Sequence, residues 1–408
     1  MKKEQQEKYM RQAINLARRG RGRTLPNPMV GAVIVKDDRV IGEGFHEEFG
    51  GLHAERNALA NVTESPEGAD MFVTLEPCAH HGKTPPCTEA IIESGIKRVF
   101  TGSEDPNPKV NGRGISCLEA AGIEVVKGVL KAECDSLNRI FFHYISTKRP
   151  YLMMKYAMTA DGKIAAYTGD SKWISSEESR ELVQSMRNEY PAIMAGIGTV
   201  LKDDPGLTCR LENGTDPVRI ICDSSLKIPM DSNIIRTASV IPTFIVCAVP
   251  GMENGILSKA HLKGVDKGNY LNRYGACVSY GGEEYVHGII EPMDKAAGLI
   301  SCGAGIINVC GDDGRTDLRH LMQILGGCGI AGVMLEGGGE LNFSALKTGI
   351  VNEVNAFIGA KMVGGEAKTP VMGEGVSAIR DAYPLKLSGI SAVGEDVLIN
   401  YTVQALNP

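Results

Sequence analysis

The chain has 408 residues, of which 43% are hydrophobic and 23% charged, and its formal net charge at pH 7 is −6. This length and ordinary globular composition suggest two or three domains. The negative charge argues against a protein that binds nucleic acid or an acidic membrane surface, and no apolar stretch reaches the ~18 residues of a membrane span. We therefore expect no nucleic-acid partner and no membrane partner.

The N-terminal segment and the cysteines both favour a cytoplasmic protein. Residues 1–20 are charged and carry one apolar face, which predicts a first helix over 4–19 rather than a signal peptide. The eleven cysteines show no regular spacing, and most of them lie inside apolar runs. Such cysteines are typical of reduced core residues in an intracellular protein.

The first 145 or so residues alternate predicted helices and strands. The predicted strands are 30–35, 39–45, 70–75, 97–101 and 123–126, and the helices that follow the first are 53–61, 88–94 and 113–121. This alternation predicts a three-layer α/β/α domain.

One histidine and two cysteines form the pattern with the clearest chemistry. His53-Ala54-Glu55 opens the second predicted helix, and Pro77-Cys78 and then Cys87 follow. A zinc ion with three protein ligands keeps a fourth position for water, whose pKa it lowers towards neutrality. Glu55 completes the H-x-E…P-C signature of zinc-dependent nucleobase deaminases, in which it relays a proton to the leaving ammonia. We predict one Zn²⁺ per chain on these three ligands, both cysteines at helix N-termini, and Glu55 as the catalytic residue.

The segment between the two cysteines differs from the commoner P-C-x-x-C arrangement. Eight residues separate the thiols, and they include His80, His81, Lys83 and Thr84, which can bind phosphate or hydroxyl groups. One histidine can line the pocket while the other faces solvent, and the sequence does not say which. A structural zinc site would need a fourth protein ligand, which either histidine can supply, but Glu55 would then have no purpose. A redox pair is disfavoured because that chemistry prefers C-x-x-C.

The residues after Arg149-Pro150 alternate strands and helices again. The predicted strands are 151–156, 192–196, 219–222, 243–248 and 332–335, with a helix over 173–187 and another from Glu340. This pattern indicates a second α/β domain with a mostly parallel sheet, so we divide the chain into domains 1–147 and 148–408. Residues 250–303 are rich in glycine and charge, and we expect a surface insertion there with little regular structure.

Several residues of the second half suit a ligand site. The turn Glu336-Gly337-Gly338-Gly339 can present backbone N–H groups and a helix start to a phosphate, although glycine triplets also form plain tight turns. Lys155 lies in an apolar strand, where a lysine is costly unless it meets an anion or a carbonyl group. Arg187 and Arg210 suit bidentate phosphate binding, or else a helix surface. The polar neighbours of Trp173 favour a ring beside a ligand over a core position.

Both halves resemble the bifunctional deaminase–reductase family of riboflavin biosynthesis. In the first half the resemblance rests on Pro26-Asn27-Pro28, on His46, and on Lys83-Thr84 within the long loop between the cysteines. In the second half it rests on four stretches in the same order, which are 155–165, 169–175, 196–208 and 336–341. Ala160 stands where the family has leucine, and this difference does not affect a polar side chain. The resemblance implies a cytidine-deaminase-like first domain and a dihydrofolate-reductase-like second domain.

The resemblance also implies which residues bind each ligand. The deaminase substrate would contact Asn27, His46, His80, Lys83 and Thr84. NADPH would contact Ala157, Trp173, Thr199, Asp203, Ser224, Gly338, Gly339 and Glu340. The reductase substrate would contact Lys155, Ser171, Arg187, Leu207, Arg210 and Glu336. The lack of G-x-G-x-x-G after the first strand of the second domain agrees with a cofactor site that is not a standard Rossmann one.

By the same resemblance, the first domain would deaminate a diaminohydroxypyrimidine that carries a phosphoribosylamino chain. The second would reduce the ribosyl group to ribityl with NADPH, with Asp203, Lys155 or water as the proton donor. Two alternatives are a single-activity deaminase whose second domain binds ligand or dimerises, and a zinc-dependent nucleotide-binding regulator without catalysis. The pocket residues of the second half argue against the former, and Glu55 argues against the latter. We expect a homo-oligomer of undetermined size.

Overall fold

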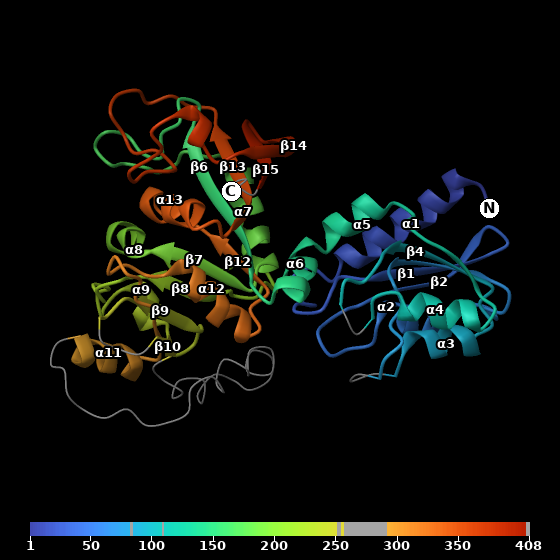
Figure 1. The fold of residues 1–408 in the computed structure, drawn as a ribbon. Helices are drawn as coiled ribbons and strands as arrows, with labels where there is room; N and C mark the ends of the chain where they lie inside the picture. Colours follow the sequence, from blue (N-terminus) through green and yellow to red (C-terminus); the bar gives the residue numbers. More distant parts are fainter. Residues whose placement is uncertain (82–84, 108–109, 251–253, 257–291, 405–408) are drawn as a thin grey trace. The chain divides into compact units, whose positions relative to one another are not determined.

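The computed structural model describes residues 1–81, 85–107, 110–250, 254–256 and 292–404. The chain divides into two compact units, Met1–Lys148 and Arg149–Pro408. Each unit has a sheet of its own (Figure 1). None of the helices in the described ranges has the length and apolarity needed to cross a membrane.

The first unit contains a five-stranded sheet in the order β2-β1-β3-β4-β5. Its strands are β1 (Gly31–Lys36), β2 (Arg39–Phe45), β3 (Asp70–Leu75), β4 (Arg98–Ser103) and β5 (Glu124–Val126). Its helices are α1 (Lys3–Arg18), α2 (Ala54–Ala60), α3 (Cys87–Glu93), α4 (Arg113–Ala120), α5 (Lys131–Leu137) and α6 (Arg139–Thr147). Strand β1 is antiparallel to β2 and β3, whereas β3, β4 and β5 are parallel.

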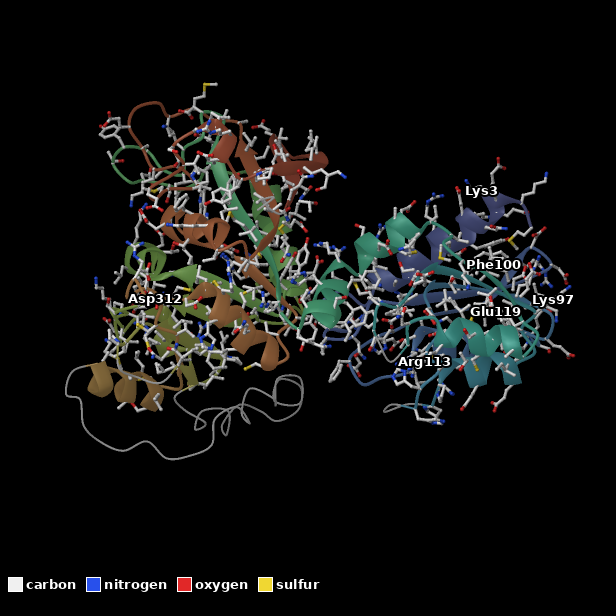
Figure 2. The ribbon with its side chains drawn as sticks, viewed as in Figure 1. Lys3, Lys97, Phe100, Arg113, Glu119 and Asp312 are labelled. Atoms are coloured by element: carbon white, nitrogen blue, oxygen red, sulfur yellow. The ribbon has the colours of Figure 1, made fainter. Side chains whose placement is uncertain are left out.

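Helices cover both faces of this sheet because successive side chains of a strand point to opposite faces. Ala32 and Ile34 of β1 share a core cluster with residues of α2, α3 and α4, whereas Val33 and Val35 share one with α1 and α5. Phe100 of β4 lies in the second of these clusters, inside the first unit (Figure 2). The unit is the three-layer α/β/α sandwich that the sequence predicts.

The second unit contains a ten-stranded sheet in the order β10-β11-β9-β8-β7-β12-β6-β13-β15-β14. Its strands are β6 (Tyr151–Thr159), β7 (Ala192–Gly196), β8 (Val218–Cys222), β9 (Thr243–Cys247), β10 (Gly255–Ile256), β11 (Gly305–Asn308), β12 (Gly332–Leu335), β13 (Val351–Gly359), β14 (Leu385–Val393) and β15 (Asp396–Val403). Its helical elements are α7 (Glu177–Glu189), α8 (Ile197–Asp203), α9 (Asn233–Arg236), α11 (Pro292–Ser301), α12 (Leu318–Gly327), α13 (Gly339–Lys347) and the 3₁₀ turn η3 (Ile379–Asp381). The strands from β11 to β13 in the sheet order are parallel, as the sequence predicts for most of the sheet.

Both faces of the second sheet are covered as well. Ile193 and Ala195 of β7 share a cluster with residues of α8, α9 and α11, whereas Ala192 and Met194 share one with α12 and α13 (Figure 1). Because β6, β7 and β12 are parallel neighbours, their carboxyl ends meet at one edge of the sheet. Ligands of open parallel sheets bind at this edge.

One prediction of local structure is wrong. The predicted helix over 173–187 begins later, because α7 starts at Glu177 and the Ser176 hydroxyl caps it by accepting the Ser179 N–H at 3.2 Å. Trp173 therefore lies in the preceding loop. The described parts of the 250–303 segment contain β10 and α11, and residues 251–253 and 257–291 lie outside the described residues, so the surface insertion expected there stays a prediction.

Candidate active sites

Three elements of the first unit bring the predicted zinc ligands together. His53 precedes α2 as its N-cap residue, Cys78 lies in the loop after β3, and Cys87 is the first residue of α3. His53 Nδ1 lies 3.5 Å from Cys78 Sγ and 3.3 Å from Cys87 Sγ, and the three ligand atoms all lie within 4.8 Å of one another. One imidazole nitrogen and two thiols at this spacing fit a zinc ion with an open fourth position.

The pKa values of the two thiols are shifted in opposite directions. The hydrogen bond from the Cys87 thiol is the largest cause that lowers the pKa of Cys78, and it raises the pKa of Cys87, which donates it. The Cys87 backbone N–H also donates to Cys78 Sγ, at 3.4 Å. The prediction that both cysteines lie at helix N-termini is wrong for Cys78, which lies in a loop and meets the helix start through this N–H group.

Glu55 lies in the first turn of α2 and is 3% exposed. Burial raises the pKa of its carboxyl group, the charge of Cys78 adds to the increase, and His53 opposes it. A carboxyl group whose pKa is raised is a stronger base than an exposed carboxyl group, which suits a residue that accepts and returns a proton. Its surroundings therefore suit the predicted proton relay.

Asn27 and His46 form a pair beside the metal ligands. His46 Nδ1 lies 2.9 Å from the Leu52 carbonyl oxygen, so this nitrogen donates, and His46 Nε2 accepts from Asn27 Nδ2 at 3.2 Å. Burial lowers the pKa of His46, which favours this neutral form. The His46 ring meets the His53 ring edge-on, with 5.5 Å between the ring centroids.

The two histidines of the intervening loop have different surroundings. His81 is exposed and lies 3.3 Å from a carboxylate oxygen of Glu89. His80 is half-buried, and its Nδ1 has no hydrogen-bond partner among the described residues. Within the described ranges neither histidine joins the cluster of metal-ligand atoms, which disfavours a structural site with four protein ligands. Lys83 and Thr84 lie outside the described residues.

Glu76 holds the loop that carries Cys78, and the sequence analysis missed it. It is 3% exposed and accepts the N–H groups of Gly112 and Gly114 at 3.0 Å each, where α4 begins. A Cβ added to Gly114 would lie 1.8 Å from the Pro77 carbonyl oxygen, so glycine allows α4 to approach this loop. The available signal was a carboxylate directly after a fully buried strand, where it needs a partner.

Arg56 holds the other end of the same loop and was also missed. Its guanidinium donates to the carbonyl oxygens of Pro85 at 3.2 Å and Pro86 at 2.8 Å. Because Arg56 belongs to α2, it ties the helix that carries Glu55 to the start of α3. The feature of the sequence that could have identified Arg56 was its position next to the proposed catalytic glutamate.

The second unit brings together three residues predicted to contact the reductase substrate. Arg187 of α7 donates to both carboxylate oxygens of Glu336, at 2.8 and 3.0 Å, and to the Thr208 carbonyl oxygen at 2.9 Å. Burial would raise the pKa of Glu336, but the charges of Arg187 and Lys155 outweigh it and lower that pKa to about 2. Burial lowers the pKa of Lys155, and Glu336 opposes the decrease. The carboxylate of Glu336 and the cationic groups of Arg187 and Lys155 are thus buried together beside the end of β12.

The other predicted substrate residues surround this cluster unevenly. The charge of Arg210 reaches Glu336 and also lowers its pKa, although the side chain is exposed. Leu207 is 4% exposed and packs in the core, with a positive φ of 50° that places its backbone in the left-handed region. Ser171 lies half-buried in the loop after β6.

The glycine turn meets α8 at the carboxyl edge of the sheet. Gly338 is the N-cap of α13, and a Cβ added to it would lie 3.8 Å from Thr199 Oγ1 in the first turn of α8. Glu340 is exposed in the first turn of α13. A helix N-terminus with bare N–H groups is a suitable place for a phosphate of a nicotinamide cofactor.

The remaining predicted cofactor residues lie along the same strands and helices. Ala157 lies on β6, Asp203 ends α8, and Ser224 follows β8. The Ser224 hydroxyl lies 3.1 Å from Thr316 Oγ1. Trp173 is 59% exposed, and the guanidinium carbon of Arg180 lies 4.6 Å from the centre of its ring system.

Comparison with known proteins identifies relatives of both units. Residues 3–103 match the model of the cytidine and deoxycytidylate deaminase zinc-binding region, and residues 150–257 and 289–399 match that of the RibD C-terminal domain. The chain is 48% identical to the riboflavin biosynthesis protein RibD of Actinobacillus pleuropneumoniae, over 97% of this chain and 94% of that protein.

Two solved structures are similar over nearly the whole chain. RibD from Acinetobacter baumannii is 30% identical, with a TM-score of 0.79 and coverage of 99% of this chain and 100% of that one. A diaminohydroxyphosphoribosylaminopyrimidine deaminase / 5-amino-6-(5-phosphoribosylamino)uracil reductase from Thermotoga maritima is 34% identical, with a TM-score of 0.78 and coverage of 98% and 99%.

Proposed function

This chain belongs to the RibD family, the bifunctional deaminase–reductases of riboflavin biosynthesis, and we propose the substrate and the site residues of each half. The first unit is a zinc-binding deaminase domain, and the second is a dihydrofolate-reductase-like reductase domain. We propose that the substrate is 2,5-diamino-6-(5-phosphoribosylamino)pyrimidin-4-one, on the strength of the likeness to the Thermotoga maritima enzyme. The single observation that carries the assignment is the convergence of His53, Cys78 and Cys87 beside the buried Glu55.

In the deaminase site, water replaces the 2-amino group of the pyrimidine and ammonia leaves. Bound zinc supplies an acidified water and an electrophile for this exchange. Glu55 takes a proton from the water and delivers it to the departing nitrogen. The neutral His46 and its partner Asn27 orient the ring, because their hydrogen bond fixes both side chains beside His53.

Lys83 and Thr84 are proposed to hold the phosphoribosyl side of this substrate. Both lie outside the described residues, so the proposal rests on the family resemblance. His80 is proposed to face the pyrimidine, which agrees with its half-buried position and with the exposed position of His81.

In the reductase site, the ribosyl group is reduced to ribityl. A bound reduced nicotinamide would supply a hydride to C1 of the sugar in its opened imine form, and the imine nitrogen would take up one proton to give the amine. Lys155 is our proposed proton donor in preference to the exposed Asp203, because burial lowers its pKa and Glu336 lies beside it. Arg187, held by Glu336, is proposed to position the substrate together with Arg210.

The cofactor is proposed to be NADPH rather than NADH. Hydroxyl groups at Ser224 and Ser225 and the N–H groups of 338–340 are candidate donors for the adenosine 2′-phosphate. Asp223 lies next to them and is buried, with one oxygen accepting the Ile228 N–H at 2.7 Å. Steady-state kinetics with both cofactors test the proposal, since equal kcat/KM values would overturn it.

We also propose that the two units fold as separate domains and that the enzyme is a cytoplasmic homo-oligomer. The cysteines in the described ranges are free thiols, which suits a reducing compartment.

Strand β14 is a nine-residue edge strand that exposes Leu387 and Ile390 by 53% and 63%. Apolar edge strands favour pairing between chains. Light scattering of the wild-type chain and of Ile390→Lys tests this, and a monomeric wild-type chain contradicts it.

The experiment that tests the proposed function measures zinc content, ammonia release and NADPH oxidation on the diaminopyrimidine substrate. We expect all three from the purified chain. A chain that holds zinc and releases ammonia but never oxidises NADPH would contradict the reductase assignment.

A further inference from the structure

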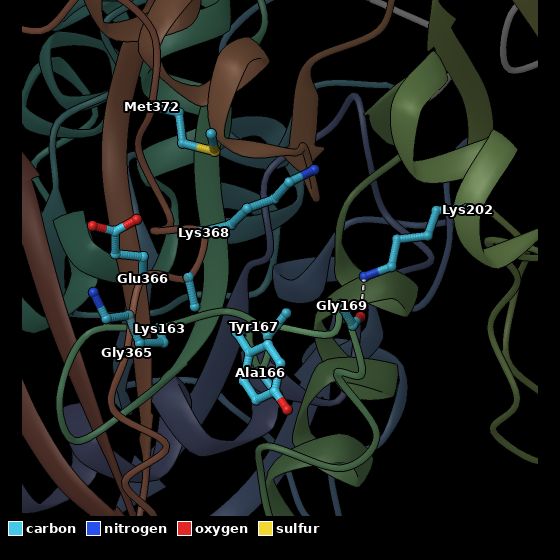
Figure 3. A pocket seen from close by; sticks show the side chains of 11 residues that line it. Lys163, Ala166, Tyr167, Gly169, Lys202, Gly365, Glu366, Lys368 and Met372 are labelled. Atoms are coloured by element: carbon cyan, nitrogen blue, oxygen red, sulfur yellow. Dashed lines mark hydrogen bonds between the residues drawn. The ribbon is translucent and has the colours of Figure 1, made fainter.

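A cavity of about 610 Å³ lies in the second unit, between the loop after β6, the last turn of α8 and the segment after β13 (Figure 3). Lys163, Lys202 and Lys368 line it, together with Glu366 and the larger side chains of Tyr167 and Met372. We call it the lysine pocket. Its volume lies in the range that admits a small molecule or part of a cofactor, rather than only an ion.

The lining carries an excess of positive charge, with three lysines against one glutamate, although the whole chain is acidic. Among the described residues none of the three lysines forms an ion pair, and Lys202 Nζ donates instead to the neutral carbonyl oxygen of Gly169 at 2.6 Å (Figure 3). Cations that gather in a concave site without counter-ions create a positive potential. The pocket therefore favours an anionic ligand.

The pocket adjoins the glycine turn of the proposed cofactor site. The Met372 N–H donates to the Gly339 carbonyl oxygen at 3.0 Å, and a Cβ added to Gly339 would lie 2.4 Å from Met372 Cγ. On the other side, Lys202 follows Thr199 by one turn of α8, and Thr199 lies beside Gly338. The lysines and the N-terminus of α13 thus border the same region, where the helix adds partial positive charge.

The two loop walls of the pocket are joined by hydrogen bonds. The Ile164 N–H donates to the Lys368 carbonyl oxygen at 2.9 Å, and the Ala160 N–H donates to the Lys361 carbonyl oxygen at 2.7 Å. The carboxylate of Asp161 accepts the N–H of Gly364 at 2.8 Å. These hydrogen bonds fix the two loops against each other, which lowers the ordering cost of binding.

We propose that the lysine pocket binds the pyrophosphate bridge of the nicotinamide cofactor, with Lys202 and Lys368 as the contacting cations. This proposal rests on the proposed reductase function and adds binding residues to it. The pyrophosphate is favoured over the adenosine 2′-phosphate because Ser224 and Ser225, the hydroxyl donors proposed for the 2′-phosphate, are not among the residues that line the pocket. The pyrophosphate is common to NADPH and NADH, so both cofactors should depend on these lysines.

The test uses the full-length protein without substrate. Trp173 is the one tryptophan of the chain and lies in the loop that continues from the pocket wall, so its fluorescence reports cofactor binding, with calorimetry as a second readout. Lys368→Ala and Lys202→Ala should each raise the Kd of NADPH and of NADH by about tenfold, because each removes a charge-assisted hydrogen bond. Lys368→Arg should keep most of the affinity.

Lys347→Ala is the matched control, because Lys347 pairs with Glu374 and lies outside the pocket lining. Its Kd values should equal those of the wild-type chain. Unchanged Kd values in both pocket variants, with a wild-type chain that binds the cofactor, would overturn the proposal alone. A loss of affinity confined to NADPH would indicate that the lysines bind the 2′-phosphate, and it would overturn the pyrophosphate assignment. A wild-type chain that binds neither cofactor would overturn the proposed reductase function as well.

Discussion

The zinc cluster of the first unit and the substrate cluster of the second are built in different ways. The zinc ligands and Glu55 all come from residues 53–87, and their ligand atoms converge within 4.8 Å of one another. Lys155, Arg187 and Glu336 come from far apart in the chain and meet because β6 and β12 are neighbours in a parallel sheet. Short-range spacing thus defines the first site, whereas sheet topology defines the second.

The largest expected effect is on the metal ligands. Cys87→Ala should lose zinc and all measurable ammonia release, because two protein ligands hold zinc poorly. Oxidation of NADPH on pre-deaminated substrate should continue, because the second site shares no residue with the cluster. Metal analysis and the two assays check this, with Cys117→Ala as the control, since Cys117 lies on α4 outside the cluster. Full zinc occupancy in Cys87→Ala would refute the ligand assignment.

Glu55→Gln should keep zinc and lose deamination by ~10²–10⁴-fold, the range of general acid–base catalysis. The amide cannot carry the proton that the buried carboxyl group relays. Ammonia release under saturating substrate measures the loss, and Glu93→Gln on the exposed side of α3 serves as the control. Activity near that of the wild-type chain would remove Glu55 from the mechanism.

Glu336→Gln should damage the reductase site and its stability together. The side chains of Arg187 and Glu336 are 11% and 14% exposed, so the variant leaves a cation without its buried partner, at a cost of about 3–5 kcal/mol. NADPH oxidation should fall and KM for the reductase substrate should rise, while zinc content stays unchanged. Glu181→Gln, at an exposed position of α7, should change neither.

The same pair predicts a pH dependence. The pKa of Glu336 falls from its ordinary 4.5 to about 2 on folding, so its contribution to stability is complete above about pH 4.5 and is lost as the pH falls towards 2. Denaturant unfolding of the second unit at several pH values should show this loss in the wild-type chain and not in Glu336→Gln. Parallel pH profiles of the two proteins would contradict the assigned cause.

Glu76→Gln should have the smallest effect. The amide can accept fewer of the N–H groups at the start of α4, which should destabilise the first unit by about 1–3 kcal/mol. Zinc affinity should fall by about 10–100-fold, since groups that orient a ligand loop act on the metal indirectly. Competition with a chelator measures the change, and Glu119→Gln, an exposed residue of α4, is its control.

The contrast between the sites also explains what the sequence could predict. The spacing of His53, Cys78 and Cys87 identified the metal cluster, because the chemistry needs these residue types and the chain brings them close through short connections. The pairing of Arg187 with Glu336 was not predictable, since it depends on the order of strands in the sheet. Glu76 was missed for the same reason, because its partners lie on α4, more than thirty residues further on.

The core strands and helices were easier to predict than the edge of the second sheet. Strand β3 is buried at every position and forms a clear apolar run, and its predicted bounds are confirmed. Strand β14 was not predicted, because the alternation of apolar and polar residues that begins at Leu385 is interrupted by the register shift between Leu387 and Gly389. Strand β15 and the parallel strand β13 were also missed.

The most direct test of two separate sites measures ammonia release and NADPH oxidation in one reaction on the diaminopyrimidine substrate. We predict one cofactor oxidised per ammonia released, with ammonia release continuing when NADPH is omitted. In Glu55→Gln, NADPH oxidation should stop on this substrate and return when the deaminated product is supplied. Oxidation at the wild-type rate by Glu55→Gln on the aminated substrate, or ammonia release that requires NADPH, would contradict the account.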